Sequence, residues 1–151
     1  MKSKLIILGC GSSVGVPRVD GFWGNCKKNN KKNLKMFFMS LEPNHYNFIK
    51  NLGYEPVGLG DKDFNDDWFK DKLGNNISAK NKNYGEYTYH YWLWQNYLDK
   101  LGDEWIGFCQ YRKFWSLEKH RTEDIDFNSL NFQVLKEIPK KFDKYESVLV
   151  E

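Results

Sequence analysis

The stretch from Met36 to Gly53 reads MFFMSLEPNHYNFIKNLG and sets the pattern for the rest of the chain. Its first four residues form a short continuous apolar run, which is typical of a β-strand. Phe48 and Leu52 then follow at a helical separation, and Gly53 stands where a helix commonly ends. The stretch therefore predicts one strand followed by one helix.

The sequence after Gly53 continues this alternation. The predicted segments are a strand at 55–59, a helix at 65–74 that Asn65 caps and Gly74 ends, a largely buried helix at 84–101, a central strand at 104–111, a weaker helix at 124–136 and a strand at 145–150. Alternating strands and helices are typical of α/β folds with a parallel sheet. We therefore expect an α/β fold with an incomplete, mainly parallel sheet and flanking helices.

The first 34 residues differ in character from the rest. Residues 4–8 predict a strand, and a glycine-rich loop follows at 9–17. The loop does not match a dinucleotide fingerprint, because Val14 stands where the third glycine is required. The basic, Asn-rich run at 27–33 predicts a solvated loop or linker. We expect two parts, an N-terminal fragment at 1–34 and a partial domain at 35–151, in a chain whose length suits one domain.

Composition excludes several classes of protein. The 151 residues carry 23 Lys plus Arg against 20 Asp plus Glu, and 40% of them are hydrophobic, which is the range of a chain with a packed core. A net charge of +3 is too small to indicate nucleic-acid binding, and no apolar run approaches the roughly 20 residues of a membrane span. Three widely spaced cysteines, Cys10, Cys26 and Cys109, favour a reducing compartment, so we expect a cytoplasmic protein without a transmembrane segment, which leaves peripheral membrane association open.

The N-terminal fragment resembles the start of metallo-β-lactamase-fold hydrolases. The resemblance rests on three matching stretches, at 8–18, 23–26 and 29–33. In that family the reaction depends on a downstream histidine-rich motif that holds two metal ions. The chain has only His45, His90 and His120, which are too far apart for that motif, so we expect no zinc and no hydrolase reaction.

Residues 36–151 resemble the N-terminal half of a family of bacterial exopolysaccharide and capsule-biosynthesis proteins regarded as glycosyltransferases. Every fixed position of one family signature, Asn-Ile-Ser-x-Lys-Asn-x-x-Tyr-x-Glu-x-Thr-x-x-Tyr-Trp-x-Trp-x-Asn, is matched from Asn76 onward. A second signature is matched at 105–114 with two departures, Gln110 in place of histidine and Lys113 in place of arginine. The resemblance implies a nucleotide-sugar donor and a glycan acceptor.

The residues of both signatures have side chains suited to that donor and acceptor. Glu86 is the candidate catalytic base for an acceptor hydroxyl. The candidate substrate-binding residues, which supply positive charge for a diphosphate or polar groups for sugar hydroxyls, are Asn76, Ser78, Lys80, Asn81, Tyr84, Arg112 and Lys113. Each also has a structural interpretation. Glu86 can pair with Arg112, Asn76 or Ser78 can cap a helix, and Trp92 and Trp94 are more often core than sugar platform.

Two acidic pairs are candidates for a divalent cation, Mg²⁺ or Mn²⁺, that would bridge to the diphosphate. Asp61 and Asp63 follow a predicted strand, which is the context that such a pair requires. Asp124 and Asp126 do not follow one. The first pair is therefore the candidate metal site.

Three hypotheses follow. The favoured one is a nucleotide-sugar-dependent glycosyltransferase of polysaccharide biosynthesis, truncated and weakly active or inactive alone. An alternative is a non-catalytic binding module whose aromatic helix is entirely core and whose open sheet edge recruits a partner. A second alternative is the remnant of a metallo-β-lactamase-fold hydrolase that lacks its metal site.

Overall fold

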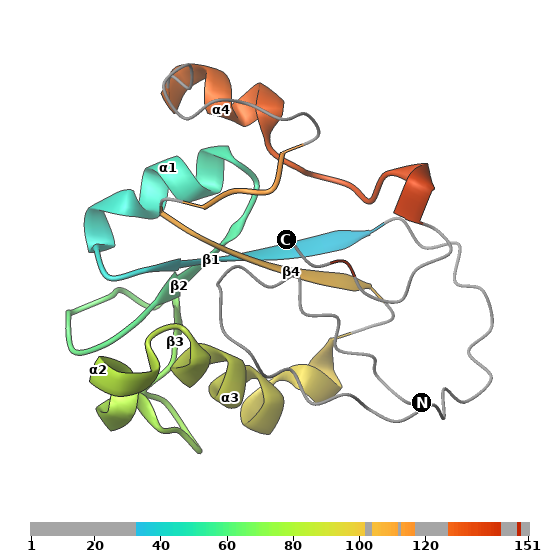
Figure 1. Ribbon diagram of the computed structural model, residues 1–151. Helices are drawn as coiled ribbons and strands as arrows, with labels where there is room; N and C mark the ends of the chain where they lie inside the picture. The colour runs from blue at the N-terminus through green and yellow to red at the C-terminus, as the bar shows by residue number, and fades with distance from the viewer. Residues whose placement is uncertain (1–32, 102–103, 112, 117–126, 143–147, 149–151) are drawn as a thin grey trace, which may run out of the picture.

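The computed structural model describes residues 33–101, 104–111, 113–116, 127–142 and 148. Four strands form one sheet in the order β3-β2-β1-β4, and every neighbouring pair is parallel. The strands are β1 (Leu34–Ser40), β2 (Glu55–Gly58), β3 (Phe69–Lys70) and β4 (Trp105–Gln110) (Figure 1). The parallel α/β fold expected from the sequence is confirmed.

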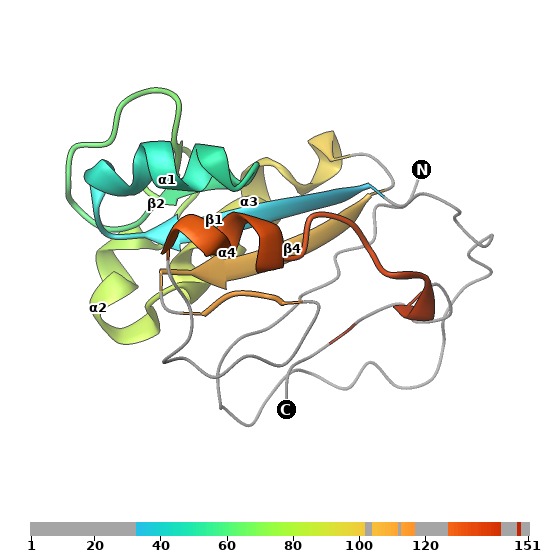
Figure 2. The ribbon, with the colours of Figure 1, turned by 90° about the horizontal axis from the view of Figure 1, so that it is seen from above.

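Helices cover both faces of this sheet. They are η1 (Pro43–His45), α1 (Tyr46–Asn51), η2 (Ser78–Lys80), α2 (Asn81–Tyr84), α3 (Tyr87–Asn96), η3 (Leu98–Lys100), α4 (Phe127–Gln133) and η5 (Lys140–Phe142). Figure 1 shows α1 and α4 above the sheet and α2 and α3 below it, and Figure 2 shows α1 and α4 side by side on the same face. The domain therefore has three layers.

Strand β1 lies between β2 and β4 and supplies both halves of the core. Side chains alternate between the faces of a strand, so Phe38 packs with Ile49 of α1 on one face and Phe37 packs with Tyr89 of α3 on the other. Phe37 and Phe38 are fully buried. A short apolar run without polar alternation is what a strand covered on both faces requires.

Helix α1 and its surroundings match the prediction. Gly53 follows the helix with a φ of +78°, a conformation that favours glycine, and its amide donates to the Lys50 carbonyl at 2.9 Å. The next residue, Tyr54, is buried and donates its hydroxyl to the Leu135 carbonyl at 2.6 Å, which holds the segment after α4 against this face. Helix α4 lies within the predicted range 124–136.

The predicted helix at 65–74 is wrong. This segment contains a turn and the two-residue strand β3. The side chain of Asn65 accepts a hydrogen bond from the Asp67 amide and so closes a local turn instead of capping a helix. Trp68 packs into the core on the α1 face, whereas Phe69 packs against the core on the α3 face. Neighbouring residues that point to opposite faces have the period of a strand.

The predicted helix at 84–101 is broken into shorter pieces. Gly85 separates α2 from α3, and η3 follows α3. The helix was also predicted to be largely buried, but only part of it is. Trp92 is 8% exposed and belongs to the core, but Trp94 is 59% exposed and Tyr87 50% exposed. The aromatic residues of α3 therefore serve both the core and the surface.

Strand β4 was expected to be central, but β1 occupies the centre and β4 lies at the end of the described sheet. Cys109 of β4 is fully buried, as expected for a small apolar side chain. The predicted strands at 4–8 and 145–150, the glycine-rich loop and the basic run at 27–33 lie outside the described residues, except for Asn33 and Val148, neither of which is in a helix or strand. None of the helices in the described ranges has the length and apolar character needed to cross a membrane.

Candidate functional site

The connections of the sheet change direction between β1 and β4. Helix α1 links β1 to β2 on one face, whereas the route from β3 to β4 passes through α3 on the other face. In open α/β sheets, ligands bind outside the carboxyl ends of the strands at the point where the connections diverge. Here that point lies beside Ser40, which ends β1, and Gln110, which ends β4.

Ser40 and His45 form a hydrogen-bonded pair at this point. Ser40 is 2% exposed, its Oγ accepts a hydrogen bond from the Glu42 amide at 2.9 Å, and Oγ lies 2.8 Å from Nδ1 of His45. When the hydroxyl donates to Nδ1, Nε2 carries the ring proton. The His45 ring also stacks on Tyr111, with centroids 6.4 Å apart, and so connects the loop after β1 to the end of β4.

The end of β4 closes in a tight turn. The Lys113 amide donates to the Gln110 carbonyl at 2.9 Å, and the Gln110 amide donates to the Lys113 carbonyl at 3.2 Å. This turn leaves the predicted substrate-binding residue Lys113 exposed beside Tyr111. Arg112, which the sequence also predicts to bind substrate, lies outside the described residues.

The loop after β2 brings the acidic pair to the same edge of the sheet. The Leu59 amide donates to the Ser40 carbonyl at 3.0 Å, and Lys62 forms an ion pair with Glu42 of the loop after β1. Asp61 and Asp63 are exposed. A shallow depression of about 450 Å³ is lined by Leu41, Glu42, Leu59, Gly60, Asp61 and Lys62.

The two carboxylates of this loop, those of Asp61 and Asp63, fit only a cation that a bound ligand also coordinates. Within the described residues, no group of three or more His, Cys, Asp or Glu side chains is placed to hold a metal ion. Mg²⁺ is usually bound by one or two carboxylates together with waters and substrate phosphates. Asp61 and Asp63 can therefore supply part of the coordination of Mg²⁺ or Mn²⁺ once a diphosphate is bound.

Two of the predicted substrate-binding residues, Asn76 and Ser78, form a local turn. The side-chain oxygen Oδ1 of Asn76 accepts hydrogen bonds from the Ser78 amide at 3.2 Å and the Ser78 hydroxyl at 2.9 Å. The Asn76 amide group donates to the carbonyls of Lys72 and Gly74. These contacts use both ends of the Asn76 side chain in a local turn, whereas Ile77 stands at the N-cap of η2 without a side-chain cap.

The side-chain amide of Asn81 also makes its hydrogen bonds within the protein. Its amide group donates to the Gly85 carbonyl at 2.9 Å and to the Thr88 hydroxyl at 3.0 Å, across the break between α2 and α3. Lys80 and Tyr84, in contrast, are exposed, with Tyr84 51% accessible. Glu86 is partly buried directly before α3. Lys80, Tyr84 and Glu86 therefore remain the candidates of this segment that can reach a ligand.

Sequence reasoning missed Asp71 and His45. Asp71 is fully buried directly after β3, and burial raises the pKa of its carboxyl group despite the hydrogen bond from Thr88. His45 is partly buried, and its ring stacks on Tyr111. The position of His45 shortly after a strand end, next to Pro43 at the start of a helical turn, is the signal that could have identified it.

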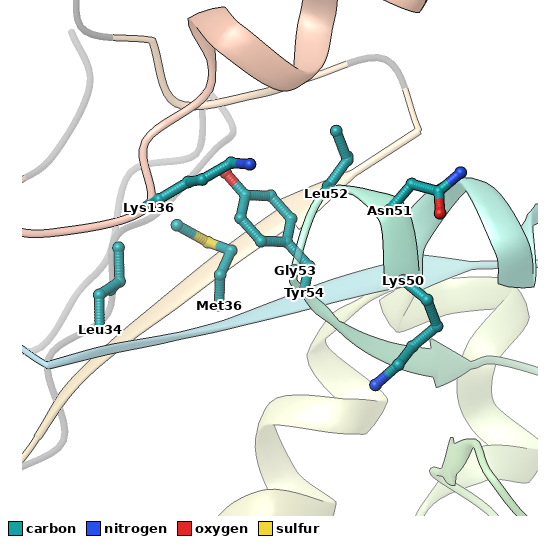
Figure 3. Close-up of a pocket in the computed structure, with 8 residues that line it drawn as sticks. All are labelled: Leu34, Met36, Lys50, Asn51, Leu52, Gly53, Tyr54 and Lys136. Carbon is teal, nitrogen blue, oxygen red and sulfur yellow. The ribbon is translucent and has the colours of Figure 1, made fainter.

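A second depression, of about 160 Å³, lies at the opposite edge of the sheet. It is lined by Leu34, Met36, Lys50, Asn51, Leu52, Gly53, Tyr54 and Lys136 (Figure 3). Its two lysines point in different directions, and each has a polar partner, Glu55 for Lys50 and Asn131 for Lys136. This arrangement does not focus charge on one ligand, so the carboxyl edge remains the candidate site.

The fold is a parallel α/β domain, and its candidate ligand site is the edge where the connections diverge. The chain belongs to the family described as domain of unknown function DUF4422, whose model matches residues 38–151. Neither the search of curated proteins nor the search of solved structures found a match. The resemblance of residues 1–34 to metallo-β-lactamase-fold hydrolases finds no support in these comparisons and stays a prediction.

Proposed function

We propose that this protein is a nucleotide-sugar-dependent glycosyltransferase of polysaccharide biosynthesis, with the donor bound at the carboxyl edge of the sheet. The observation that carries the proposal is the divergence of connections between β1 and β4, because it places Ser40, His45 and Tyr111 together at the usual ligand position of such sheets. The family signatures from Asn76 and at 105–114 support the same class of donor.

The donor's diphosphate would meet the positive and hydrogen-bonding groups of this edge. Lys113 is exposed at the end of β4, and the Nε2 proton of His45 is available when Ser40 donates to Nδ1. Asp61 and Asp63 would share a divalent cation with the phosphates. The partly exposed ring of Tyr111 offers a flat surface for the nucleobase.

Transfer of the sugar requires a base and a leaving group. We assign Glu86 as the base that takes the proton of the acceptor hydroxyl while the new bond to the anomeric carbon forms and the bond to the diphosphate breaks. The negative charge that develops on the leaving diphosphate would be stabilised by the cation and by Lys113. A cytoplasmic location, where nucleotide sugars would be met, is part of the proposal.

Isothermal titration calorimetry with UDP-sugars and other nucleotide sugars, with and without Mn²⁺, tests donor binding. We expect binding that needs Mn²⁺ and that weakens about tenfold in His45→Ala, as for the loss of one charge-assisted contact. Lys140→Ala changes an exposed lysine of η5 and is the matched control. Absence of heat with every donor, in the presence of Mn²⁺, would remove the assignment and leave the alternative of a non-catalytic binding module.

A further inference from the structure

Asp71 is a buried carboxylate that the proposed chemistry does not use. It directly follows β3, its side chain is fully buried, and one of its oxygens, Oδ1, has no hydrogen-bond partner among the described residues. Burying a carboxylate costs several kcal/mol unless other groups compensate. The contacts that Asp71 makes must therefore offset this cost.

The groups around Asp71 come from two separate parts of the carboxyl edge. The Thr88 hydroxyl at the start of α3 donates to Oδ2 at 2.5 Å, and Thr88 in turn accepts from Asn81 of α2 at 3.0 Å. On the other side, the Asp71 amide donates to the Gly58 carbonyl at 3.4 Å, and the Gly60 amide interacts favourably with the ionised carboxyl. Lys72 supplies the nearby positive charge.

These contacts connect the loop after β2 to the helices that carry the first family signature. Gly60 directly precedes Asp61, and Asn81 and Thr88 flank Glu86 in the sequence. Thr88 is itself fully buried, so its hydroxyl cannot contact a ligand. Thr88 therefore has a structural role here that does not involve substrate, and Asn81 donates to the Thr88 hydroxyl.

We infer that Asp71 is a positioning residue that, together with Thr88 and Asn81, fixes the loop bearing Asp61 relative to the segment bearing Glu86. The link to the cation and the donor rests on the proposed function. The positioning role of Asp71 does not depend on the proposed function, because it concerns only how two segments of the same edge are held together.

Thr88→Val tests the inference, since valine keeps the shape of threonine and removes the hydroxyl, and Thr88→Ser is the matched control that restores it. Hydrogen exchange of two amides in the full chain reports on the loop, that of Leu59, which donates to Ser40, and that of Asp71, which donates to Gly58. We expect both to exchange about tenfold faster in Thr88→Val through local opening, and near the original rate in Thr88→Ser. The Leu52 amide of the α1 region, on the other face of the sheet, is the reference for a general loss of stability.

Two outcomes would overturn the inference. In one, the Leu59 and Asp71 amides keep their rates in Thr88→Val. In the other, the exchange rate of the Leu52 amide rises by the same factor, which shows a general loss of stability.

Asp71→Asn, which keeps the side-chain shape, gives a second measurement under the same criteria. Titration of the same variants with UDP and Mn²⁺ adds the functional readout, with affinity expected to fall in Thr88→Val and return in Thr88→Ser. If the unaltered protein binds no donor, the proposed function fails while hydrogen exchange still decides the role of Asp71.

Discussion

His90 on α3 is a neutral histidine held in an apolar environment. Its ring meets Phe108 edge to face, with centroids 4.3 Å apart, and neither ring nitrogen has a hydrogen-bond partner in the described part of the chain. Burial lowers the pKa of His90 from its ordinary 6.5 to about 4. His90 therefore takes up a proton at a lower pH in the folded state than in the unfolded chain.

The stability of the protein should consequently fall as the pH decreases from about 6.5 to about 4, because only the unfolded state gains the proton of His90 in this range. At pH 5 the cost is about 2 kcal/mol of unfolding free energy, and at pH 8 it is absent. His90→Leu removes this contribution. Urea unfolding of both proteins at pH 5 and pH 8 checks it, and an equal loss of stability in both would contradict it.

At the scale of residues, the sequence identifies side chains by type but not by environment. Asn76 and Asn81 were predicted to bind substrate because amides suit sugar hydroxyls. In the structure, both side-chain amides donate to nearby backbone or side-chain groups. Asp71 was overlooked because a carboxylate next to Lys72 has the pattern of a solvated surface. Only the tertiary structure shows that the chain buries it.

At the scale of elements, apolar runs located β1 and β4 well, because strands covered on both faces need continuous apolar sequence. Strand β2 has no such run, but it lies within the predicted strand at 55–59. The prediction of a helix at 65–74 was wrong because it rested on the ends of the segment alone, Asn65 as a cap and Gly74 as a stop. Trp68 and Phe69 instead fill cores on opposite faces of the sheet, which overrides the local preference. No pattern of local sequence contains that information.

The break between α2 and α3 provides a prediction at this scale. Gly85 has φ +52° and ψ −131°, a region that residues with a side chain rarely adopt, although a Cβ at this position would meet no atom within 4 Å. Gly85→Ala should therefore cost about 1–3 kcal/mol through backbone strain alone. Chemical denaturation measures this cost, and Lys82→Ala on α2 is the control. A cost below that of the control would show that the break can relax.

At the scale of the whole molecule, the α/β class follows from alternation, but the strand order does not. The order β3-β2-β1-β4 depends on α3 crossing to the face opposite α1, and both faces are similarly apolar. The meeting of His45 and Tyr111 depends on this order, because they follow strands far apart in the sequence. The candidate site could therefore be assembled only once the sheet was known.

Donor binding should also be visible as stabilisation of the whole fold. A ligand that binds only the folded state at about 100 times its Kd adds about 2.7 kcal/mol, which corresponds to roughly 5–10 °C in Tm for a domain of this size. We expect such a shift in thermal unfolding with UDP-sugar plus Mn²⁺ and little shift with Mn²⁺ alone, because Asp61 and Asp63 need the phosphates to complete the coordination. A full shift with Mn²⁺ alone would indicate a preformed metal site instead.

The central position of β1 has a consequence for biosynthesis. Leu34 lies opposite Trp105, so the partner on one side of β1 is translated long after β1 itself, whereas β2 follows soon on the other side. During translation, β1 and β2 can pair while the far edge of β1 still awaits β4. A nascent chain in this state presents an unpaired apolar edge to other nascent chains and to chaperones. Slow translation between β3 and β4 should therefore lower the soluble yield of this protein.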